Sequence, residues 1–203
     1  MRCLFLVFVV CSANVSFGDI TYVFENATTT IGGGLDGMAS GSFTQQGVQM
    51  TATSFVTNEA SVFNSTNTGG FGINQTGSGD DTDGFDFTGA NAGEEAEGLI
   101  LSFDQNVDLV SIDIGSFNAG NDEITITVGG TTVATITTGG LSSLGDFSVA
   151  ANTDVEIITT GGVYGNGWSL NSFTVTPEPG SLSLLAVAGV MGLRIRRRRK
   201  PLA

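Results

Sequence analysis

The densest group of chemically useful side chains is a run of seven carboxylates within eighteen residues. Carboxylate oxygens are the hard ligands that calcium prefers. An EF-hand loop here would need an acid or amide at Gly79 and an acid at Ala90, so that motif fails, as does the nonapeptide of calcium-binding β-rolls. The residues suggest Asp81, Asp83 and Glu95 as ligands, or else an acidic loop in water. The whole group is Asp80, Asp81, Asp83, Asp86, Glu94, Glu95 and Glu97.

Two aromatic residues in a glycine-rich stretch offer a second kind of site. Tyr164 and Trp168 could form a platform for a sugar ring, with Asn166 as a polar contact. The alternative is that Trp168 begins the last strand and packs into the core, because large aromatic side chains dominate core burial. Core packing of Trp168 is the preferred interpretation, and a sugar platform is the second.

Groups suited to catalysis are scarce between Asp19 and Thr176, a segment without Lys, Arg or His. Cys3 and Cys11 lie before it, so it offers no thiol, amine or imidazole for nucleophilic or acid–base chemistry. A glycosidase needs two carboxylates about 5 to 10 Å apart, and no pair stands out among so many acids. We therefore expect a protein that is not an enzyme.

The distribution of charge excludes nucleic acid as a partner. The chain has a net charge of −13, and every acid except Glu178 lies between Asp19 and Thr176. Binding to nucleic acid depends largely on Lys and Arg, which neutralise phosphates. Carboxylates without cationic neighbours also repel one another, so salt should stabilise this segment. An external, ion-rich compartment suits such a protein.

A sequence signal of another kind follows the acidic segment. Pro177-Glu178-Pro179 favours an extended backbone, because each proline restricts its own and the preceding residue. Residues 180–195 are mostly apolar and predict a single transmembrane helix, although the uninterrupted apolar run is shorter than the usual ~20 residues. A basic tail, residues 194–200, should stay on the cytoplasmic side. Its basic residues are Arg194, Arg196, Arg197, Arg198, Arg199 and Lys200.

The order of triplet, apolar helix and basic tail resembles the PEP-CTERM family of bacterial sorting signals, from Pro177 to Lys200. The resemblance implies recognition by an exosortase, a membrane-embedded processing enzyme, with cutting near Pro177, Glu178 and Pro179. It also implies release or transfer to the cell surface, usually in bacteria that make extracellular polysaccharide. It implies nothing about the domain upstream, because unrelated domains carry the same tail.

The first eighteen residues predict a secretory signal peptide. Arg2 precedes a short apolar run, and Ser16-Phe17-Gly18 places small residues before a cut at Asp19. The apolar run is too short to span a bilayer of about 30 Å. Export would remove both cysteines, so the mature chain would be stabilised by packing alone.

Short β-branched and aromatic runs, separated by Gly, Asn, Asp and Thr, predict strands throughout residues 19–176. Val128-Gly129-Gly130-Thr131 suits a tight hairpin turn. The spacing favours an all-β fold, an antiparallel β-sandwich of the jelly-roll type, with long loops and a few short strands from Ser40 to Ala92. The expected strands are 20–25, 48–57, 98–103, 107–114, 123–128, 132–137, 146–149, 155–159 and 168–175.

Together these features predict an exported, non-catalytic protein of the cell surface or extracellular matrix. Its partners would be the secretion machinery, an exosortase and, through its C-terminal helix, the membrane. A carbohydrate-binding module or adhesin supported by calcium is the second interpretation, with extracellular polysaccharide as its ligand. A secreted polysaccharide hydrolase is the third.

Overall fold

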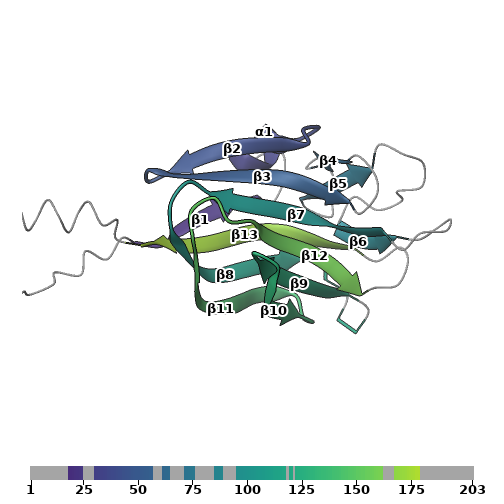
Figure 1. Ribbon diagram of the computed structural model, residues 1–203. Helices are drawn as coiled ribbons and strands as arrows, with labels where there is room; N and C mark the ends of the chain where they lie inside the picture. Colours follow the sequence, from purple (N-terminus) through teal and green to yellow (C-terminus); the bar gives the residue numbers. More distant parts are fainter. Residues whose placement is uncertain are drawn as a thin grey trace, which may run out of the picture. The chain divides into compact units, whose positions relative to one another are not determined.

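Alternation of apolar and polar residues places most of this chain in β-strands. The computed structural model describes residues 18–24, 30–56, 61–64, 71–75, 85–88, 95–117, 119–120, 122–161 and 167–178. These residues belong to one unit, Gly18–Glu178. Within it, the strands pair in antiparallel ladders, which confirms the all-β prediction (Figure 1).

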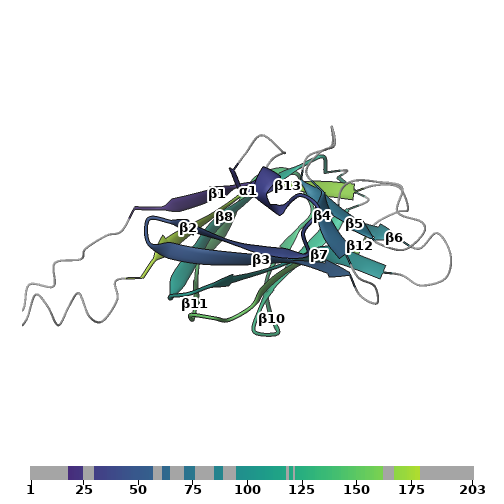
Figure 2. The same ribbon diagram turned by 90° about the horizontal axis from the view of Figure 1, so that it is seen from above.

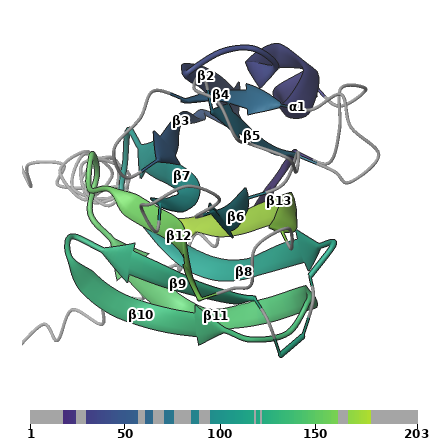
Figure 3. The ribbon, with the colours of Figure 1, turned by 90° about the vertical axis from the view of Figure 1, so that its right-hand side faces the viewer.

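The first ladder, called sheet 1, contains the first and last strands of the chain as neighbours. Its order is β1, β13, β8 and β11, each antiparallel to the next, and Figure 3 shows β13, β8 and β11 side by side. These strands are β1 (Ile20–Val23), β13 (Gly167–Pro177), β8 (Val107–Gly115) and β11 (Gly140–Val149).

The second ladder, called sheet 2, has the order β2, β3, β7, β12, β9 and β10, again with antiparallel neighbours. Its strands are β2 (Ser40–Gln45), β3 (Val48–Val56), β7 (Glu95–Phe103), β12 (Val155–Gly161), β9 (Glu123–Val128) and β10 (Thr131–Ile136). The short β6 (Phe85–Thr88) pairs with both β13 and β7 and so links the two sheets. A helix, α1 (Thr30–Leu35), and a hairpin of β4 (Ser61–Asn64) and β5 (Gly72–Gln75) complete the described elements.

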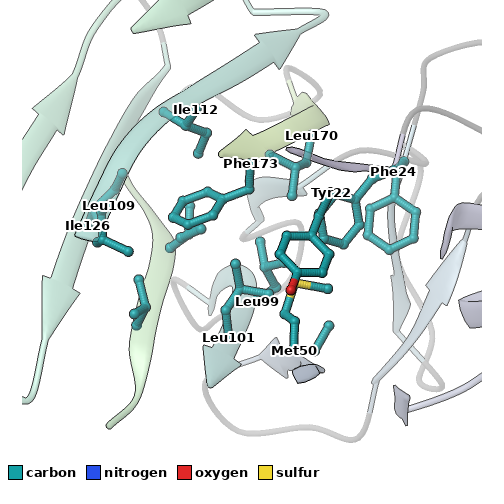
Figure 4. Packing of buried hydrophobic residues seen from close by; sticks show 14 of the residues in the cluster. Tyr22, Phe24, Met50, Leu99, Leu101, Leu109, Ile112, Ile126, Leu170 and Phe173 are labelled. Atoms are coloured by element: carbon teal, nitrogen blue, oxygen red, sulfur yellow. The ribbon is translucent and has the colours of Figure 1, made fainter. Parts of the chain in front are cut away.

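The apolar faces of the two sheets share one core, in the manner of a sandwich. Leu99 and Leu101 of sheet 2 and Leu109 and Phe173 of sheet 1 are all fully buried (Figure 4). The ring of Phe173 stacks on that of Phe103, with centroids 6.5 Å apart, and so joins β13 to β7. Burial of these alternating residues is the main driving force that holds the ladders together.

Three glycines show why the chain follows this path. Gly129 and Gly130 both have positive φ angles, 55° and 81°, and join β9 to β10 by the predicted two-residue turn. At Gly98 on β7, a Cβ atom would lie 2.2 Å from the carbonyl oxygen of Ile157, so only glycine fits between the strands.

The observed strands differ from the predicted ones mainly in length. The structure begins β11 at Gly140 rather than at residue 146, because pairing with β8 recruits residues of low β propensity. The positive φ of Asp146, 53°, lies in the bulge that this pairing requires. Between Ser40 and Ala92, the structure describes β3 and the short strands β2, β4, β5 and β6, in agreement with the few short strands expected there.

Candidate sorting site at the end of the last strand

The last strand runs directly into the predicted sorting triplet. Pro177 is buried, aligns with Val107 of β8 and forms the final residue of β13. Glu178 follows it as the last described residue and is half-buried. The last strand thus ends at Pro177 rather than at the predicted residue 175, because pairing with β8 continues into the triplet.

Asn106, in the turn between β7 and β8, binds Glu178 twice. Its carbonyl oxygen accepts a hydrogen bond from the Glu178 N–H at 3.1 Å, and its side-chain Nδ2 donates to Glu178 Oε2 at 3.2 Å. Its Oδ1 also accepts from the N–H of Ala151 at 3.0 Å. Asn106, in the turn between β7 and β8, therefore connects Glu178 at the end of β13 with Ala151 in the turn between β11 and β12.

The neighbouring residues of this turn bind a third segment instead. The Asp104 Oδ1 accepts from the Gln49 N–H at 2.9 Å, and the Gln105 Nε2 donates to the carbonyl oxygen of Gly47 at 3.3 Å. The 104–106 turn therefore ties the β2–β3 turn to the body through Asp104 and Gln105. Among these three residues, Asn106 binds Glu178, directly after β13.

The start of the folded unit lies beside its end. The antiparallel pair β1–β13 aligns Ile20 with Val175, and the Thr176 hydroxyl donates to Asp19 Oδ1. Figures 1 and 2 show β1 and β13 reaching the same end of the molecule, on the left of each view. The residue predicted to follow the signal-peptide cut is therefore adjacent to the predicted sorting triplet.

A buried phenol near this end has a strongly shifted pKa. Tyr22 on β1 is fully buried, and its hydroxyl donates to the carbonyl oxygen of Val48 at 3.1 Å. Burial, together with the negative charge of Asp104, raises the pKa of Tyr22 to about 12. The hydroxyl therefore stays protonated at neutral pH.

Several predicted site residues lie outside the described residues. They include Pro179, the predicted helix 180–195 and all six basic residues of the tail, Arg194, Arg196, Arg197, Arg198, Arg199 and Lys200. Among the helices that the structure describes, none has the length and apolar character needed to cross a membrane.

The predicted calcium ligands are only partly described. Asp81 and Asp83 lie outside the described residues, whereas Glu95 begins β7, with its side chain undescribed. In the part of the chain that the structure describes, no three acidic, His or Cys side chains gather closely enough to bind a metal. The calcium site therefore stays a prediction.

The structure places Trp168 in the core, as the preferred interpretation held. Its side chain is fully buried, its ring stacks on Phe85 with centroids 4.4 Å apart, and its Nε1 donates to Thr159 Oγ1 at 2.8 Å. The indole face is therefore covered and cannot stack on a sugar at the surface. Tyr164, its predicted partner, lies outside the described residues.

Sequence reasoning missed Asn106, the residue that contacts the triplet most directly. It is separated from Glu178 by 72 positions, so no local pattern reveals the contact. The available signal was the polar run Asp104-Gln105-Asn106 between two predicted strands, which indicates a turn but not its partner.

Comparison with known protein families, with curated proteins and with solved structures finds no match to this chain. No function is therefore transferred from another protein. The interpretation of the site depends on the residues and contacts of this chain, together with the sequence resemblance of Pro177 to Lys200.

Proposed function

We propose that this chain is an exported, non-catalytic protein of the cell surface or extracellular matrix, sorted through Pro177, Glu178 and Pro179. The supporting observation is that the last strand leads into this triplet, since Pro177 ends β13 and Glu178 is the last residue of the folded unit. No spacer separates the folded unit from the sorting signal. A processing enzyme at the membrane surface would meet the domain and the triplet together.

The sequences of both ends of the chain support secretion. A signal peptide at residues 1–18 would direct export, and the apolar residues 180–195 would hold the precursor in the membrane with residues 194–200 inside. An exosortase would then act near the triplet and release the acidic domain or transfer it to the cell surface. These roles follow from the resemblance to PEP-CTERM signals.

For the domain itself we infer a jelly roll. The pairing is nested, with β1 on β13, β7 on β12, β8 on β11 and β9 on β10, as in one long hairpin rolled into two sheets. This topology supports a passive scaffold but assigns no ligand, because one fold serves many functions. Trp168 is enclosed in the core, so a sugar platform formed with Tyr164 is not part of the proposal.

Mass spectrometry of the C-terminus of the mature protein tests the sorting role. We expect the wild-type chain to lose residues beyond the triplet, and Pro179→Ala to remain full length in the membrane fraction. Pro179 lies beyond the folded unit, so this change alters the triplet without replacing a residue of that unit. Ser181→Ala is the matched control and should be processed normally. A wild-type chain found intact in the cytosol would overturn the proposal.

A calcium contribution is tested separately, because it does not depend on sorting. If Asp81, Asp83 and Glu95 bind calcium, the full-length protein should melt at a higher temperature with calcium than with a chelator. The triple change Asp81→Asn, Asp83→Asn and Glu95→Gln should remove that difference. Equal melting temperatures for the wild-type protein would eliminate the calcium site.

A further inference from the structure

The sorting triplet has few polar groups by which a partner could recognise it. Pro177 and Pro179 have no backbone N–H, so the N–H of Glu178 is the only backbone donor in the triplet. The carboxylate of Glu178 is its only charged group. In the folded domain both groups are bound by Asn106, through a backbone bond of 3.1 Å and a side-chain bond of 3.2 Å.

Pro177, the first proline of the triplet, also contacts the folded domain. Pro177 is buried and aligned with Val107, so this part of the triplet lies along β8 as a continuation of β13. An enzyme that reads an extended segment forms hydrogen bonds with its backbone and encloses its side chains. The same groups cannot serve the enzyme and the sheet at once, so binding to the enzyme competes with the contacts of Asn106.

We propose that Asn106 gates the processing step: the enzyme binds the triplet only after Pro177 detaches from β8 and Glu178 detaches from Asn106. This inference rests on the proposed sorting function and adds its control. Asn106 itself is exposed, so its bonds to Glu178 lie at the surface and open at small cost. The body of β13 is held by the buried residues Phe173 and Val175 and stays paired when the end opens.

Two variants separate the gate from the general stability of the turn. Asn106→Asp keeps an oxygen that can accept from the Ala151 N–H, but it replaces the donor to Glu178 with a negative oxygen. Gln105→Ala is the matched control, because Gln105 lies in the same turn and its side chain binds Gly47 instead. When Glu178→Gln is added to Asn106→Asp, the side-chain amide at position 178 can donate to the carboxylate at position 106. The side-chain hydrogen bond is then restored with donor and acceptor exchanged.

Amide hydrogen exchange of Glu178, measured by NMR on the full-length chain in detergent micelles, reports opening directly. We expect exchange about tenfold faster in Asn106→Asp, unchanged in Gln105→Ala and slowed again in the double variant. The Thr174 amide, farther inside β13, should exchange alike in all of them. Equal Glu178 exchange in the wild-type chain and Asn106→Asp would overturn the gate, and faster exchange at Thr174 as well would mean general loosening, which also overturns it.

Processing in cells distinguishes failure of the gate from failure of the proposed function. In a host with the processing enzyme, pulse-chase labelling should show that Asn106→Asp is cut several-fold faster than the wild-type chain and Gln105→Ala. Equal rates for all three would overturn the gate and leave the sorting function standing. If none of the chains is cut, the sorting function fails, and the gating role fails with it.

Discussion

The two ends of β13 are fixed by opposite kinds of interaction. At its aromatic end, Trp168 is fully buried and stacks on Phe85, which in turn lies 6.2 Å from Phe71 between ring centroids. At its polar end, about 30 Å away along the strand, Thr176 and Glu178 form surface hydrogen bonds with Asp19 and Asn106.

Because of this difference, the aromatic end of β13 should be hard to open, whereas the polar end should open easily. Removing a buried aromatic ring costs several kcal/mol, whereas a surface hydrogen bond contributes about 1 kcal/mol or less. The aromatic end should therefore open only when the domain unfolds, and the polar end should open locally many times before that. The proposed sorting triplet follows the end that should open easily.

The largest effect is expected from truncating Trp168 at the aromatic end. Trp168→Ala should lower the free energy of unfolding by about 3 to 5 kcal/mol, because it leaves a cavity beside Phe85. Chemical denaturation of the full-length chain in mild detergent measures this loss. Gln105→Ala, at the polar end, should change stability by less than about 0.5 kcal/mol. Similar losses in both variants would remove the contrast between the ends.

A pH titration examines the one buried phenol near the polar end. The pKa of Tyr22 is about 12 in the folded state, against 10.0 ordinarily, so its contribution to stability is complete below pH 10. Between pH 10 and 12 the unfolded chain loses this proton first, and about 2 to 3 kcal/mol of stability should disappear. Stability measured against pH should be flatter in Tyr22→Phe. A wild-type curve as flat as that of the variant would contradict the burial of the hydroxyl.

A smaller loss is expected when the polar partner of Trp168 is removed. Thr159→Val has nearly the same shape but leaves the buried Nε1–H of Trp168 without its acceptor. The free energy of unfolding should fall by about 1 to 3 kcal/mol. Thr159→Ser keeps the hydroxyl and serves as the control. If Val is tolerated better than Ser at this position, the hydrogen bond contributes little to the aromatic end.

The smallest effect is expected at the surface pair of the polar end. Thr176→Val removes the hydrogen bond to Asp19 but keeps a β-branched side chain on β13. Global stability should change by less than about 0.5 kcal/mol, as is usual for surface substitutions. Chemical denaturation measures the global stability, and hydrogen exchange of the Glu178 amide measures local opening of the polar end. A loss comparable to that of Thr159→Val would show that the polar end is not loosely held.

Much of the fold could be predicted because its determinants are local. The alternation of Leu99, Leu101 and Phe103 indicated a strand with one buried face, and all three side chains are buried in β7. The pair Gly129-Gly130 indicated a tight turn because only residues that tolerate positive φ form one easily. Burial of Trp168 was the preferred interpretation for a similar reason, its large apolar area.

The site could not be predicted as fully, because its contacts join distant parts of the chain. Nothing near Glu178 in the sequence indicates that Asn106 binds it, and nothing near Asp19 indicates Thr176. The sequence predicted a last strand over 168–175, followed by a separate signal from Pro177, and did not indicate that the strand continues into the triplet. Here Pro177 occupies the end of β13, where the missing N–H is tolerated because the ladder finishes.

The adjacency of β1 and β13 also makes the domain suitable for circular permutation. Because Asp19 is hydrogen-bonded to Thr176, a linker of a few residues could join the two ends of the folded unit. New termini placed at the exposed turn Gly129-Gly130 would leave the strand pairs of both sheets unchanged, because this turn only connects β9 to β10. Such a permutant would keep the same scaffold, with Asp19 and Thr176 joined within one continuous segment.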